Sequence, residues 1–132
     1  MAIANTLVYL GIGLLFLVVG SIVFSYSTKM SEKEQIIEKG NTAVALMFSG
    51  KMLGLAIVIM SAAKFSVNLT DYAIWCVIGI ILQIIAYWVV EIIIFTKVSL
   101  VKKVEEGNVA VAIMLFIISV SVGCIISGAI SY

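Results

Sequence analysis

The chain has 132 residues, of which 64% are apolar and 11% are charged, and its formal net charge is +1. Globular domains are about 45–50% apolar and about 25% charged, so this composition excludes an ordinary soluble domain and indicates a membrane protein. The small net charge gives no reason to expect nucleic acid as a partner. The sequence has no His, and its two Cys lie inside apolar runs. This excludes His-dependent catalysis, Cys/His zinc sites and a disulfide scaffold, so we expect no cofactor and no metal.

Four apolar runs are long enough to cross a bilayer. They are residues 3–26, 42–63, 72–95 and 109–132. Each has at least 20 residues, and at about 1.5 Å of rise per residue such a helix crosses roughly 30 Å of hydrocarbon. The first run has no Lys or Arg before it and no convincing cleavage site, so we expect a retained span and not a signal peptide. The predicted fold class is an all-α integral membrane protein with four transmembrane helices.

The distribution of lysine predicts how the chain is oriented. Segments 27–41 and 96–108 contain three Lys each, whereas the connection between the second and third spans contains only Lys64. Because Lys and Arg collect in cytoplasmic loops, we expect these two longer segments in the cytoplasm and both termini outside. Segments 27–41 and 96–108 could then bind a soluble cytoplasmic partner.

The chain contains an internal repeat. Segment 38–47 matches segment 105–114 at a constant offset of 67 residues, with seven identities. This offset is about half of the chain, and it predicts two helix pairs of the same orientation, residues 1–66 and 67–132. Such a parallel duplication differs from the inverted repeats of many transporters.

A Gly-Asn pair begins the second span and another begins the fourth. Gly40 and Gly107 can end a short preceding helical segment in the left-handed conformation. Asn41 and Asn108 can then cap the next spanning helix. The alternative is that the two helix N-termini bind an anion such as a lipid phosphate. We prefer capping, because Asn is a favoured cap without any ligand.

Several motifs together resemble a known family. They are the repeated Gly-Asn-x-Ala-x-Ala, the stretch 49–54, the pair 71–72 that begins the third span, and Gln83. The chain resembles, over nearly its whole length, the domain-of-unknown-function 350 family of small YjfL-like bacterial membrane proteins. The resemblance implies a four-span inner-membrane protein without enzyme activity, and the family's genetic neighbourhoods imply a role in membrane stress or envelope maintenance. Lys51 departs from the pattern, which has a small or uncharged residue there.

Polar residues inside the predicted spans are the functional candidates. Gln83, Tyr87 and Glu91 are spaced by four and line one face of the third span. Lys51 lies about 15 Å deep in the second span, counting 1.5 Å per residue. Intramembrane ionisable groups usually mark function, so we predict that Lys51 faces the protein interior and approaches Glu91, Gln83 or a hydroxyl. The alternatives are that Lys51 snorkels along its helix and that Glu91 simply reaches the cytoplasmic interface.

Small residues form rows in two spans. Gly50 and Gly54 make a GxxxG motif in the second span, and Ser119, Gly123 and Ser127 make a row in the fourth. Such rows let helices approach closely, either within one chain or between copies. The number of rows predicts a homo-oligomer.

Two classes of function follow from these features. The first is a structural or accessory oligomer that recruits a soluble partner through its cytoplasmic loops. The second is a small homo-oligomeric transporter or ion channel that uses the polar stripe of Lys51, Gln83, Tyr87 and Glu91. An enzyme is not expected, because no nucleophile–base pair, metal cluster or phosphate loop is found in the sequence.

Overall fold

The computed structural model describes residues 2–28, 33–94 and 100–130. In these residues the secondary structure is entirely helical: α1 (Ala2–Thr28), η1 (Glu34–Glu38), α2 (Thr42–Phe65), α3 (Leu69–Ile94), α4 (Leu100–Glu105) and α5 (Val109–Ile130). Four of these helices, α1, α2, α3 and α5, are long and apolar enough to cross a membrane. The predicted all-α fold with four spanning helices is therefore confirmed. The end of the third predicted span at Phe95 and the last two residues of the fourth lie outside the described residues.

The third helix begins three residues earlier than its apolar run predicts. Asn68 Oδ1 accepts a hydrogen bond from the Asp71 N–H at 2.9 Å, and Asp71 Oδ2 accepts one from the Val67 N–H at 3.0 Å. Asn68 is therefore the N-cap of α3, and it lies before the apolar run that begins at Tyr72. A polar residue that satisfies the first backbone N–H groups extends a helix beyond its apolar core.

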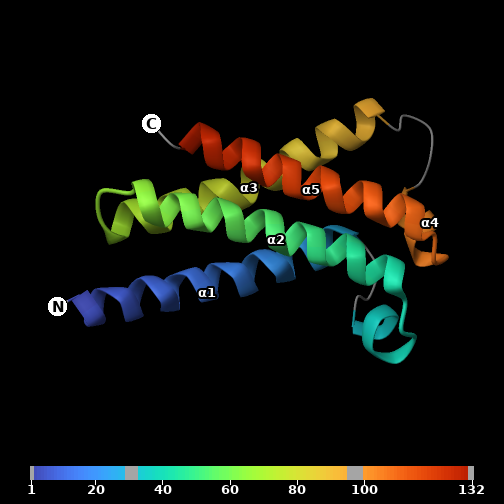
Figure 1. Ribbon diagram of the computed structural model, residues 1–132, viewed down its shortest axis with the longest axis horizontal. Coiled ribbons are helices and arrows are strands. Elements are labelled where there is room, and N and C mark those ends of the chain that lie inside the picture. The colour runs from blue at the N-terminus through green and yellow to red at the C-terminus, as the bar shows by residue number, and fades with distance from the viewer. Residues whose placement is uncertain (1, 29–32, 95–99, 131–132) are drawn as a thin grey trace.

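The long helices alternate in direction, so that α1 begins and α5 ends at the same end of the bundle (Figure 1). Helices α2 and α5 run in the same direction, and their contact is the most extensive in the fold. The short elements η1 and α4 lie at the end where α2 and α5 begin. Helix α3 packs against both α2 and α5, whereas α1 packs against α2 and α3.

Backbone contact between α2 and α5 depends on glycine. A Cβ added to Gly54 would lie 2.5 Å from the Ser119 backbone oxygen, and one added to Gly123 would lie 2.6 Å from the Gly54 Cα. A Cβ on Gly50 would lie 2.6 Å from the Phe116 Cα. The two small-residue rows thus pack against each other inside one chain, a choice that the sequence left open.

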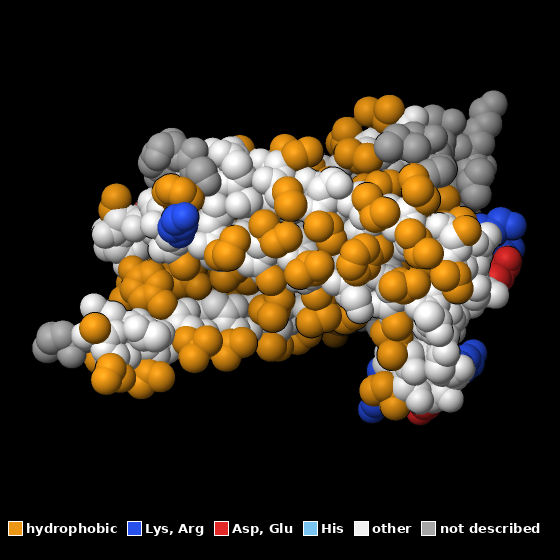
Figure 2. Space-filling model, in the orientation of Figure 1, with side chains coloured by type: hydrophobic (Ala, Val, Ile, Leu, Met, Phe, Trp, Pro, Cys, Tyr) orange, Lys and Arg blue, Asp and Glu red, His pale blue; other side chains and the backbone are white. Residues whose placement is uncertain are grey.

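The outer surface of the bundle suits a lipid environment. Large apolar side chains of α1 and α3 are exposed, for example Ile3, Leu15 and Ile93. On the face drawn in Figure 2, apolar side chains cover the lengths of the helices, and charged ones lie at the two ends. Because exposed apolar surface of this extent is unfavourable in water, the bilayer is the solvent for these helices.

Candidate functional site

The interior of the bundle holds a polar cluster, here called the Lys51 cluster, made of Lys51, Gln83, Tyr87 and Ser119. Its members come from α2, α3 and α5. The exposed fraction is 6% for Lys51, 2% for Gln83 and 0% for Ser119. Three helices therefore enclose one cationic and two neutral polar side chains in the membrane-spanning region.

Lys51 faces the protein interior and not the surrounding lipid. Its Nζ lies 4.8 Å from the centroid of the Tyr87 ring, which is the distance of a cation–π contact. Glu91 lies one turn further along α3, is half-buried and interacts electrostatically with Lys51. The sequence reasoning named Glu91, Gln83 or a hydroxyl as the partner and missed the ring. The spacing of the sequence could have indicated this contact, because Tyr87 lies midway between Gln83 and Glu91 on the same helical face.

Gln83 connects α3 to α2. Its Nε2 donates a hydrogen bond to the Lys51 backbone oxygen at 3.2 Å. Within the described part of the chain, Gln83 Oε1 and Ser119 Oγ are buried and have no hydrogen-bond partner. The amide nitrogen of Gln83 therefore makes the interhelical bond, and the amide oxygen takes no part in it.

A small cavity lies at this cluster. Its volume is about 10 Å³, measured as the space open to the centre of a water molecule. Its walls are formed by Phe24, Lys51, Gln83, Ile84, Tyr87, Trp88 and Ser119. A space of this size holds about one water molecule and is too small to pass a solute.

The two Gly-Asn turns have the same local geometry. Gly40 has φ +62° and Gly107 has φ +93°, values that favour glycine. The Val44 N–H donates to Asn41 Oδ1 at 3.3 Å, and the Val111 N–H donates to Asn108 Oδ1 at 3.1 Å. Each asparagine therefore caps its spanning helix.

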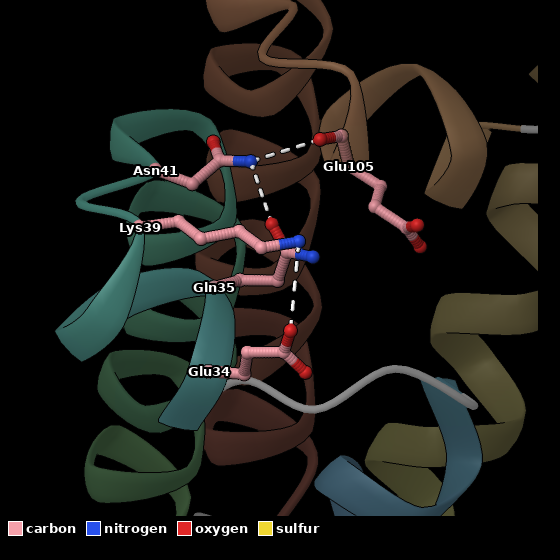
Figure 3. Close-up of polar contacts among 5 residues, drawn as sticks. All are labelled: Glu34, Gln35, Lys39, Asn41 and Glu105. Carbon is pink, nitrogen blue, oxygen red and sulfur yellow. Dashed lines mark hydrogen bonds and ion pairs between the residues drawn. The ribbon is translucent and has the colours of Figure 1, made fainter.

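Asn41 also joins η1 to α4 (Figure 3). Its Nδ2 donates to the Glu105 backbone oxygen at 2.9 Å and to Gln35 Oε1 at 3.2 Å. Glu105 ends α4, where helix carbonyl oxygens lack partners within the helix. An ion pair of 3.5 Å between Lys39 and Glu34 lies on the exposed side of η1. One asparagine thus holds η1, α2 and α4 together, whereas Asn108 is exposed.

Ser127, another predicted site residue, takes part in the packing of α2 against α5. Ser127 accepts a hydrogen bond at its backbone oxygen from Ser61 Oγ, at 3.0 Å, near the far end of the α2–α5 pair. In residues 2–28, 33–94 and 100–130, no three His, Cys, Asp or Glu side chains are grouped as a metal site would require. The distinctive polar chemistry inside the bundle is therefore that of the Lys51 cluster.

Comparison with known proteins shows that nearly the whole chain matches one protein family. Residues 1–130 match the family described as Domain of Unknown Function (DUF350). The chain is 30% identical over 122 residues to the "UPF0719 transmembrane protein YshE" of Bacillus subtilis, and the match covers 92% of this chain and 90% of that protein. It is 34% identical over 79 residues to the "UPF0719 inner membrane protein YjfL" of Escherichia coli.

The coverage of the relatives differs. The match to YjfL spans 60% of this chain and 59% of that protein. A "UPF0719 transmembrane protein" of Aquifex aeolicus is 26% identical over 87% of this chain, but the match spans only 45% of that protein. No solved structure matches the chain significantly.

Proposed function

The chain belongs to the DUF350 family of multi-pass membrane proteins, and from this premise we propose that it is a non-enzymatic accessory protein of the bacterial inner membrane. It holds a fixed cytoplasmic surface to which a soluble partner binds during envelope maintenance. This surface, the cytoplasmic platform, consists of η1, α4 and the two Gly-Asn turns. The inner-membrane location rests on the similarity to the inner membrane protein YjfL. The envelope role rests on the family resemblance.

One observation carries this proposal: the bonds of Asn41 to η1 and α4. Two loops of a four-helix protein need no mutual connection in order to span a membrane. Here a half-buried amide connects them, beside a polar hollow of about 440 Å³ lined by residues of both turns. A pre-ordered surface lowers the entropic cost of binding a partner.

Orientation and assembly complete the proposal. Lys33, Lys39, Lys102 and Lys103 all lie on the platform side. This supports a cytoplasmic position of the platform and an outer position of both termini, because Lys and Arg collect in cytoplasmic loops. A homo-oligomer would associate through the outer faces of α1 and α3, because the glycine rows are occupied by the α2–α5 contact. The similar turns at Gly40 and Gly107 support an origin by duplication of residues 1–66 and 67–132.

A transporter or channel is the second candidate. A lysine ammonium inside the bundle, with Glu91 one helical turn away from Tyr87, is the observation that favours it. Intramembrane charges often belong to ion or proton pathways. The small size of the cavity at Lys51 favours the accessory role.

Complementation of a deletion strain distinguishes the two functions. The readout is survival under envelope stress, with membrane abundance of each variant measured in parallel. The accessory role predicts that Lys102→Ala with Lys103→Ala on the platform abolishes complementation, while Lys51→Met with Glu91→Gln preserves it. The reverse pattern at equal abundance would reject the accessory role and support transport.

A further inference from the structure

Two buried oxygen atoms of the Lys51 cluster lack a donor within the described residues. Gln83 Oε1 and Ser119 Oγ have no hydrogen-bond partner, although both side chains are more than nine-tenths buried. Native proteins rarely leave buried polar atoms unsatisfied, because desolvation of the atom is then uncompensated. Both residues line the same small cavity.

The orientation of the Gln83 amide is fixed by its neighbour. Nε2 donates to the Lys51 backbone oxygen, and exchange of the amide atoms would place two oxygen atoms in contact. Oε1 is therefore the atom that remains without a donor. An acceptor in this position attracts a hydrogen-bond donor and repels an anion.

Size and chemistry together identify the class of ligand. The cavity of about 10 Å³ is close to the minimum that one water molecule occupies. Lys51 lines the same cavity and carries only donors, whereas Ser119 can donate or accept. A water molecule can donate to Gln83 Oε1 and Ser119 Oγ and accept from the Lys51 ammonium.

We propose that the cavity between α2, α3 and α5 binds one water molecule, which bridges Lys51, Gln83 and Ser119. The water completes the hydrogen bonds of both neutral side chains. It also partly replaces the hydration that the Lys51 ammonium loses on burial, while the Tyr87 ring covers another side of the cation. This binding site does not depend on the accessory role proposed above.

The chain offers a simple spectroscopic test. It contains two glutamines, Gln35 and Gln83, so labelling with ¹⁵N-glutamine gives two side-chain amide signals, and Gln35→Ala assigns them. Protein in phospholipid vesicles is measured by water-edited solid-state NMR. We expect rapid magnetisation transfer from water to the Gln83 amide despite its depth in the membrane. Transfer should fall several-fold in Ser119→Val, which fills the cavity, and persist in Ser119→Ala, which leaves the space open.

Equal transfer to Gln83 in the wild type and in Ser119→Val would overturn the proposal. If Ser119→Val does not fold, the unfolding midpoint of Ser119→Ala decides. A water-bound hydroxyl predicts a lower midpoint than in the wild type, whereas a hydroxyl without a partner predicts an unchanged or higher one. Ser121→Ala is the matched control, because Ser121 is exposed on the same helix.

Discussion

Asn41 and Asn108 occupy equivalent positions in the repeated motif but have different surroundings. Both cap a helix, and only Asn41 is seen to donate across the platform, to Glu105 and Gln35. Asn41→Asp keeps the capping oxygen but turns the Nδ2 donor into an acceptor that faces two oxygen atoms. We expect a loss of about 0.5–1.5 kcal/mol in the free energy of unfolding, the usual net contribution of a hydrogen bond, because Asn41 is half-buried and Glu105 is exposed.

Asn108→Asp provides the control for that substitution. Its carboxylate still caps α5 and interacts favourably with the helix dipole, so the change in stability should stay within about 0.5 kcal/mol. Unfolding curves in mixed detergent micelles measure both variants. Equal effects of the two substitutions would contradict the bridging role of Asn41.

Lys51 and Glu91 provide a second prediction at the scale of single residues. Lys51→Met removes the cation from beside a half-buried carboxylate. We expect a destabilisation that Glu91→Gln partly reverses, with a coupling energy of about 0.5–3 kcal/mol in a double-mutant cycle. The measurement is the unfolding free energy of the wild type, both single variants and the double variant. Strictly additive changes would show that the two charges do not interact.

The sequence predicted on which helix face these residues lie, but it did not predict which residues they contact. Spacing by four puts Gln83 and Tyr87 on one face of a helix, and Gly-Asn predicts a turn and a cap, because both signals are local. The contact of Lys51 with the Tyr87 ring and the bond from Asn41 to Glu105 depend on how separate helices meet. A single sequence does not determine those relative positions.

At the scale of elements, the most extensive contact in the fold is between α2 and α5. Gly123→Ala would press a methyl group against the Gly54 backbone, which cannot rotate away as a side chain would. We expect a loss of roughly 1–3 kcal/mol, typical of overpacking. Gly54→Leu, with a larger group at the same contact, should disrupt the pair.

Gly128→Ala in the same helix is the control, since a Cβ there meets no atom within 4 Å. Alanine favours a helix over glycine, so this variant should be unchanged or more stable by up to about 1 kcal/mol in a helix-forming environment. Thermal unfolding monitored by circular dichroism in detergent measures both variants. Equal destabilisation would show that the α2–α5 contact tolerates a side chain.

Hydropathy predicted all four long helices, because burial in lipid needs long apolar runs. It placed the start of α3 too late, since the cap at Asn68 lies in a polar turn that hydropathy does not register. The rows at Gly54 and Gly123 signalled close packing but not the partner, because a small-residue row is equally suited to a helix of the same chain or of another copy. The structure resolves that choice through the backbone contact.

For the whole molecule, the strongest prediction concerns orientation. Four described lysines lie at the η1 and α4 end, and Lys64 lies at the opposite end of α2. Moving the cluster of positive charge outward would oppose the positive-inside bias of membrane insertion. The η1 and α4 end should therefore face the cytoplasm, and the α2–α3 connection should face outward.

Cysteine labelling of intact cells tests this orientation. The native Cys76 and Cys124 are first replaced by serine or alanine, and single cysteines are then introduced at exposed sites that make no side-chain bond in the described structure. Val67→Cys lies beside Asn68 at the predicted outer end and is 82% exposed in the wild type. Glu38→Cys and Glu106→Cys lie at the predicted inner end.

A membrane-impermeant maleimide should label Val67→Cys in intact spheroplasts, and it should label the other two only after permeabilisation. The inverse pattern would reverse the orientation, remove the platform from the cytoplasm and thereby exclude a soluble cytoplasmic partner at that surface.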